Sequence, residues 1–130
     1  MEIEPDVAVY FRSNSAKNLL THWMGGPDFA VEVASKHDRT WDKLDFYAAV
    51  QTRELLVIDR DPWKLSLLRL ENGQLVAVGV SVLPEGKPIT SAVLPVTLKL
   101  TPRENLVPMI EVQHQQDGRR WNVDPVIHGR

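Results

Sequence analysis

The fold of this chain is set by the segment Phe29-Ala-Val-Glu32-Val33, which has the length and apolarity of a buried strand but carries a carboxylate. Burying an unpaired carboxylate costs several kcal/mol, so such a group normally finds a cation, a metal ion or hydrogen-bond donors. Residues 41–50 follow with apolar side chains at helical spacing, and residues 54–59 then contain four consecutive apolar residues. A strand, a helix and a strand in this order predict an α/β crossover.

The flanking segments extend this prediction. Residues 7–11 are mostly apolar, which suits a strand covered on both faces. Residues 65–70 and 75–80 form two predicted strands, and Asn72-Gly73 between them is a strong hairpin signal. Pro95 interrupts residues 92–100, which indicates an edge strand or a short strand. Residues 111–113 and 121–123 complete a terminal hairpin. We therefore expect one α/β domain over residues 1–130, with a mixed β-sheet, flanking helices and a β-rich C-terminal half.

Composition limits the function and the compartment. The 15 basic and 17 acidic residues give a net charge of −2, which argues against a surface built entirely for nucleic acid. A local groove needs only a few cationic side chains. The chain has no cysteine, so disulfides and thiolate metal sites are excluded. No apolar run approaches the ~20 residues of a membrane span, and the acidic N-terminus is unlike a signal peptide. We expect a cytoplasmic protein with no membrane partner.

Two strand carboxylates and one lysine form the candidate site. Asp6 precedes the first strand and Glu32 lies in the second. Two carboxylates about 4 Å apart repel by ~4 kcal/mol at an effective dielectric of about 20, so a shared proton or a divalent cation is expected between them. Mg²⁺ suits such oxygen ligands, and the Val33 carbonyl is a natural third one. Lys43, at the start of the predicted helix, would orient a water or neutralise charge on a phosphate.

Each residue also has an ordinary structural explanation. Asp6 follows a proline and suits a turn, and Lys43 suits a solvated helix surface. Glu32 would be unremarkable if its strand face were open to water. His37 could carry a proton in the same site, but an exposed loop histidine is the more ordinary explanation.

The ordered motifs resemble a known family. Pro5-Asp6-Val-Ala-Val is followed by Glu32-Val-Ala-Ser35 and then by Lys43-Leu-Asp-Phe-Tyr47. Over roughly residues 4 to 100 this order resembles the putative restriction endonuclease domain family of the PD-(D/E)XK nuclease superfamily. The resemblance implies a mixed sheet flanked by helices and Mg²⁺-dependent cleavage of DNA. It also implies that Asp6 is the first metal carboxylate and Glu32 the second.

The resemblance leaves the lysine and the N-terminus open. The superfamily motif would place its lysine at the position of Ala34, whereas the related family takes it from the next helix, which here is Lys43. Lys36 is a rival, closer to Glu32 in sequence. Tyr47, one helical turn beyond Lys43, either positions the lysine or packs in the core. The superfamily core has a helix and a strand before the Pro-Asp strand, and only four residues precede Pro5 here. We therefore expect a shortened member.

Three functions follow from these residues. The first is a Mg²⁺-dependent DNA endonuclease with Asp6, Glu32 and Lys43 as catalytic residues, supported by Tyr47, Lys36 and His37. The second is a catalytically inactive nuclease-like module that binds a partner. The third is a dimerisation domain that uses the β-rich second half, so a homodimer is among the expected partners.

Overall fold

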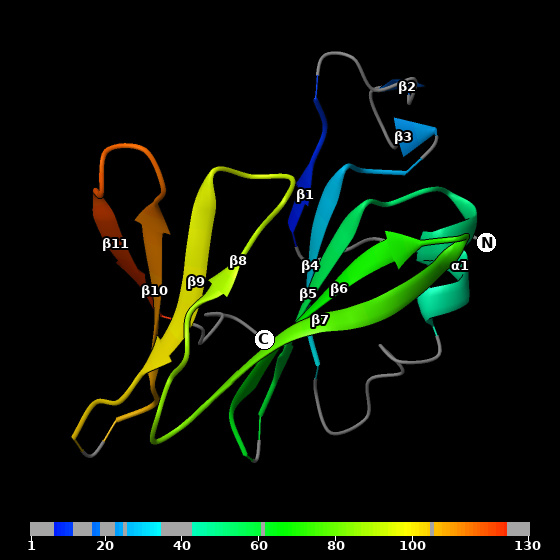
Figure 1. Ribbon diagram of the computed structural model, residues 1–130. Coiled ribbons are helices and arrows are strands. Elements are labelled where there is room, and N and C mark those ends of the chain that lie inside the picture. Colours follow the sequence, from blue (N-terminus) through cyan, green and yellow to red (C-terminus); the bar gives the residue numbers. More distant parts are fainter. Residues whose placement is uncertain are drawn as a thin grey trace.

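The strands of the computed structural model form two main sheets (Figure 1). The structure describes residues 7–11, 17–18, 23–24, 26–34, 43–60, 62–104 and 106–124. The first sheet has five strands in the order β1-β4-β5-β6-β7, the second has four in the order β11-β10-β9-β8, and β2 and β3 form a separate pair. The elements are β1 (Val7–Val9), β2 (Lys17–Asn18), β3 (Trp23–Met24), β4 (Phe29–Val33), α1 (Leu44–Ala49), β5 (Glu54–Asp59), β6 (Lys64–Glu71), β7 (Gln74–Val82), β8 (Ile89–Thr90), β9 (Val96–Thr101), β10 (Met109–His114) and β11 (Arg120–Val123).

The first sheet is mixed, as expected. β4 and β5 pair in parallel, with α1 between them in the chain, which confirms the predicted crossover. The other pairs, β1 with β4, β5 with β6 and β6 with β7, are antiparallel. The parallel pair arises because a helical segment returns the chain to the same end of the sheet before β5 begins.

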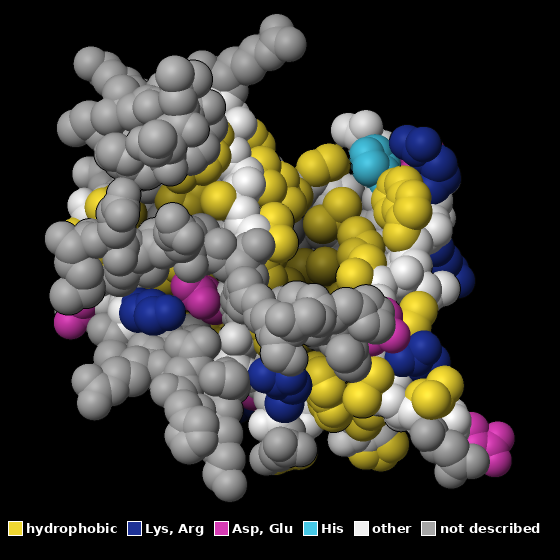
Figure 2. All heavy atoms as spheres, turned by 180° about the vertical axis from the view of Figure 1, so that it is seen from behind, with side chains coloured by type: hydrophobic (Ala, Val, Ile, Leu, Met, Phe, Trp, Pro, Cys, Tyr) yellow, Lys and Arg dark blue, Asp and Glu magenta, His cyan; other side chains and the backbone are white. Residues whose placement is uncertain are grey.

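The two faces of this sheet are covered by different structures. One face packs under α1 through an apolar cluster that includes Ala30, Tyr47 and Leu55. The other face packs against the second sheet, in a core built from both sheets. The buried members of this core are Phe29, Leu56, Ile58, Leu65, Leu67, Ile89, Leu98, Leu100 and Ile110. Seen from behind, hydrophobic side chains gather between the two sheets and line a hollow there (Figure 2).

The prediction of a mixed sheet and a β-rich C-terminal half is confirmed, but several flanking helices are not present in the described part of the chain. There, α1 covers one face and the second sheet covers the other. The second half forms strands and not helices because its apolar residues alternate with a period of two. Leu98 and Leu100 are buried on one side of β9, while Lys99 between them is more exposed. None of the helical structure in the described residues has the length and apolarity needed to cross a bilayer.

Helix α1 is shorter than the predicted span of 41–50. It begins after Lys43, and residues 41–42 lie outside the described residues. It ends in a Schellman motif, because Thr52 N–H donates to the Tyr47 carbonyl and Gln51 adopts a positive φ of 62°. Gly26 approaches this end closely: a Cβ added there would lie 2.4 Å from the carbonyl oxygen of Val50. The helix is therefore fixed against the segment that leads into β4.

Two predicted hairpins are confirmed. The predicted cover on both faces of residues 7–11 is wrong, and of the two alternatives for residues 92–100 the edge strand is wrong. Asn72 and Gly73 both have positive φ between β6 and β7, and β10 pairs with β11. β1 is not covered on both faces: it is an edge strand, and Val7 is 52% exposed. β9 is not an edge strand, because it begins after Pro95 and lies between β8 and β10. Pro95 therefore removes no hydrogen bond from the ladder.

Candidate functional site

β4 carries Glu32 on the face of the first sheet that α1 covers. Side chains alternate along β4: Phe29 belongs to the core between the two sheets, whereas Ala30 packs under the helix. Glu32 is two residues beyond Ala30 and therefore shares its face. Only 2% of Glu32 is exposed. The carboxylate is thus held between the sheet and α1.

The start and the middle of the helical segment bring two polar side chains to this carboxylate. The Tyr47 hydroxyl donates a hydrogen bond to Oε1 of Glu32. Lys43 Nζ lies 3.9 Å from Oε2 of the same residue. Tyr47 is 1% exposed, whereas the Lys43 side chain is 30% exposed. The structure therefore brings together three of the predicted site residues, one from a strand and two from the segment that follows it.

These groups suit the chemistry of a hard cation and a phosphate. A carboxylate oxygen is a ligand that Mg²⁺ prefers, so the donor type at Glu32 fits this ion. The Lys43 ammonium is beyond hydrogen-bond distance of Glu32, so the two interact as separated charges. Because Lys43 is partly exposed, an anion arriving from solvent can reach it. Negative charge developing near Glu32 would be stabilised by this ammonium.

For the other predicted site residues, the structure adds no contact to the group around Glu32. Asp6, Lys36 and His37 lie outside the described residues. Val33 ends β4, and its side chain packs against the core between the sheets. Among the residues that the structure describes, no cluster of three or more His, Asp or Glu side chains is arranged to hold a metal ion. The metal roles of Asp6, Glu32 and Val33 therefore remain predictions.

A second buried carboxylate, which the sequence did not single out, lies on the opposite face of the sheet. Glu54, at the start of β5, is 0% exposed. Arg69 Nε and Nη2 lie 2.9 and 2.8 Å from its Oε2, and Ala92 N–H donates to the same oxygen at 2.9 Å. Ser91 Oγ donates to Oε1 at 2.6 Å. This network joins β5, β6 and the loop after β8.

The pairing of Glu54 with Arg69 could have been predicted from the sequence. β5 and β6 pair in a register that joins Asp59 to Lys64 and Glu54 to Arg69. A tight turn after Asp59 predicts this register, because residues then pair one by one outward from the turn, and Glu54 comes to lie opposite Arg69. The contacts from Ser91 and Ala92 come from a loop far along the chain, and no local signal indicates them.

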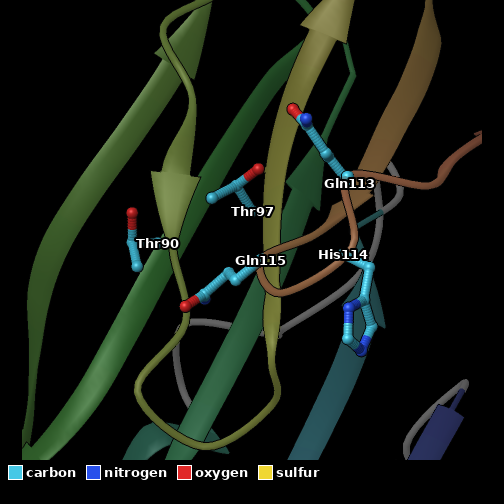
Figure 3. A pocket seen from close by; sticks show the side chains of 6 residues that line it. Thr90, Thr97, Gln113, His114 and Gln115 are labelled. Atoms are coloured by element: carbon cyan, nitrogen blue, oxygen red, sulfur yellow. The ribbon is translucent and has the colours of Figure 1, made fainter.

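The second sheet carries a pocket of about 300 Å³ (Figure 3). Its lining includes Thr90 of β8, Thr97 of β9, Gln113 of β10 and Gly118 of the following turn. In the same turn the Arg119 amide donates to Asp117, and this bond lowers the pKa of the Asp117 carboxyl. The pocket contains none of the predicted site residues.

Comparison with known protein families places the chain in one of them. The family model described as "Uma2: Putative restriction endonuclease" matches residues 1–103. No curated protein and no solved structure matches the chain. The match includes β4 and α1, and it ends before β10.

Proposed function

Because the chain belongs to the Uma2 family, described as putative restriction endonucleases, we propose that it is a Mg²⁺-dependent endonuclease that hydrolyses phosphodiester bonds in DNA. The observation that supports this most directly is the group around Glu32. A buried strand carboxylate, a phenol and a partly exposed ammonium converge there. A purely apolar layer between sheet and helix would need none of the three.

The proposal assigns metal binding to Asp6, Glu32 and the Val33 carbonyl. Asp6 lies outside the described residues, but it directly precedes Val7 in the sequence. Val7 pairs with Val31, and Glu32 directly follows Val31 in the neighbouring strand. Cross-strand partners in an antiparallel ladder share one face of the sheet. This pairing supports the proposal, because Asp6 and Glu32 are the sequence neighbours of two residues that pair across the sheet.

The other residues take separate roles in the proposed reaction. Bound Mg²⁺ supplies polarisation of the phosphodiester and a lowered pKa for a coordinated water. Lys43 neutralises negative charge that builds up on the phosphate oxygens during attack. Tyr47 holds one oxygen of Glu32 and so fixes the direction of the other. Lys36 remains the alternative lysine, and His37 a possible proton carrier.

A paired variant experiment tests this proposal. Glu32→Gln removes the charge but keeps the size of the side chain, and Glu71→Gln changes an exposed strand glutamate as a control. We expect wild type and Glu71→Gln to nick supercoiled DNA with Mg²⁺ or Mn²⁺, and Glu32→Gln to be inactive although folded by circular dichroism. Nicking that survives in folded Glu32→Gln contradicts the proposal.

Metal binding separates the endonuclease from an inactive module. Calorimetric titration with Mn²⁺ should show a site in wild type and Glu71→Gln that is lost in Glu32→Gln. At roughly a hundredfold excess over Kd, the ion should stabilise the fold by ~2.7 kcal/mol. Absence of both binding and stabilisation in the wild type would leave the non-catalytic module as the better explanation.

A further inference from the structure

The turn that joins β6 to β7 consists of an asparagine followed by a glycine. Asn72 and Gly73 have φ values of 52° and 81°, and Glu71 pairs with Gln74 on either side of them. Two central residues with positive φ define a type I′ turn. In the sequence, Asn72 is the only asparagine that a glycine follows. The turn therefore contains a side chain that can react with the backbone beside it.

An asparagine before glycine can lose its side-chain nitrogen without an enzyme. The backbone nitrogen of the glycine attacks Cγ of the asparagine, and the new C–N bond closes a five-membered imide. The carboxamide C–N bond breaks, and its nitrogen leaves as ammonia with the proton of the glycine amide. Water then opens the imide at Cγ to give aspartate, or at the backbone carbonyl to give isoaspartate. Glycine permits this reaction because it has no Cβ to obstruct the approach.

The surroundings of Asn72 leave it open to this reaction. Residues 71–74 are all exposed, and the Asn72 side chain has no hydrogen-bond partner among the residues that the structure describes. A Cβ added at Gly73 would meet no atom within 4 Å, so this side of the turn faces open space. Packed side chains therefore do not keep water from an imide at this position.

Asp117-Gly118, in the turn between β10 and β11, is the comparable pair, and its groups are held in place. The Asp117 carboxylate accepts from the Arg119 amide at 2.9 Å and from Nε of the same residue at 2.8 Å. The bond from the amide lowers the pKa of the Asp117 carboxyl, and an ionised carboxylate resists attack by a nitrogen. Gly118 N–H also donates to the His114 carbonyl at 3.0 Å. The two turns therefore differ in expected reactivity.

We propose that Asn72 is a deamidation site that the folded turn protects, so that modification proceeds through opening of the β6–β7 hairpin. The first central residue of a type I′ turn has a ψ of about +30°. This rotation turns the Gly73 nitrogen away from the Asn72 side chain, whereas ring closure needs both on the same side of the Cα–C bond. The turn must therefore open locally before the nitrogen reaches Cγ.

The product would alter the hairpin beside helix α1. Isoaspartate adds one carbon atom to the backbone, which a two-residue turn cannot accommodate without a change in register. Leu75 pairs with Leu70 next to the turn and packs against the apolar cluster that includes Tyr47. Figure 1 shows the turn at the end of the first sheet where α1 lies. Modification of an exposed turn would thereby loosen the packing under the helix.

Mass spectrometry of the intact chain and of its peptides measures the reaction. Samples are kept at mildly alkaline pH, either folded in buffer or unfolded in guanidinium chloride. We expect the mass gain of an NH₂-to-OH exchange at Asn72 in both, at least ~10-fold faster in the unfolded chain, equivalent to about 1.4 kcal/mol for opening the turn. Asn122 is the internal control and should stay unmodified, because the branched side chain of Val123 obstructs attack.

Two variants test the same site without denaturant. Asn72→Gly removes the reactive side chain and tolerates positive φ, so the mass gain in this peptide should vanish. Leu75→Ala weakens the packing behind the turn and should speed the reaction at Asn72. Equal rates in the folded and unfolded wild type would overturn the protection, and no gain at Asn72 in the unfolded chain would overturn the site. A Leu75→Ala chain that is folded by circular dichroism and reacts no faster than wild type also contradicts the proposal.

Discussion

Glu32 and Glu54 are buried on opposite faces of one sheet, in very different surroundings. Glu54 receives hydrogen bonds from Ser91 and Ala92 and a close guanidinium from Arg69. Glu32 receives the Tyr47 hydroxyl, while its ammonium partner stands 3.9 Å away and is partly exposed. Burial alone therefore does not distinguish a structural carboxylate from a candidate catalytic one. The difference lies in the contact with the cation: the Arg69 guanidinium lies 2.8 Å from Glu54, whereas the Lys43 ammonium lies 3.9 Å from Glu32.

The largest expected effect on stability is at Glu54. Glu54→Gln should lower the free energy of unfolding by about 3 kcal/mol, because it leaves the Arg69 guanidinium without its buried carboxylate and turns an amide toward existing donors. Glu32→Gln should cost less than ~1 kcal/mol, because the amide oxygen still accepts from Tyr47. Urea denaturation of both variants measures this difference. Equal losses would mean that Glu32 is as structural as Glu54.

Tyr47→Phe should have the next largest effect. It removes the hydroxyl that donates to Glu32 and leaves a buried carboxylate oxygen without that donor, so we expect a loss of about 1.5 kcal/mol. Urea denaturation of Tyr47→Phe and of wild type measures this loss. If the two unfold at the same urea concentration, the phenol contributes nothing specific to Glu32.

Lys43→Met should separate stability from activity. An ion pair of 3.9 Å with a partly exposed lysine contributes less than ~0.5 kcal/mol. Under the proposed function, however, losing the ammonium should slow DNA nicking about 100-fold. Single-turnover cleavage and urea denaturation give the two quantities. Lys36→Met serves as the comparison, and a larger loss of cleavage there would transfer the role to Lys36.

The smallest effect on stability is expected at Asp117, an exposed carboxylate that can be compared with the buried carboxylates of Glu32 and Glu54. The bond from the Arg119 amide lowers its pKa in the folded state. Its contribution to stability is therefore present above the unfolded-state pKa and is lost as the pH falls through the folded-state pKa. On acidification from about pH 6 to about pH 3, Asp117→Asn should lose less thermal stability than wild type. A steeper loss than that of wild type would contradict the assigned direction.

Local signals predicted the part of the fold that surrounds Glu32. The apolar run of β4, the helical spacing before Tyr47 and the run of β5 lie within about thirty residues, so each could be recognised from its own period. Asn72-Gly73 predicted a hairpin because a turn signal is also local. The helical spacing also predicted that Lys43 and Tyr47 share a side, which the contacts with Glu32 confirm.

Long-range packing could not be predicted in this way. An alternating pattern identifies β9 as a strand, but it does not say that the buried side of β9 covers the first sheet. Pro95 suggested an edge strand or a short strand because the predicted run began at residue 92, whereas β9 begins at Val96, directly after the proline. The contacts from Ser91 and Ala92 to Glu54 depend on how a distant loop folds back.

The close approach of Gly26 to Val50 has a consequence for the group around Glu32. Val50 caps α1, and the same helix carries Tyr47. A methyl group at position 26 would act as a wedge under that end of the helix, tilting it away from β4. The spacing of the phenol and the ammonium from Glu32 therefore depends on the absence of a side chain at Gly26, beside the C-terminal end of the helix, and alanine at position 26 would disturb it while leaving every polar group in place.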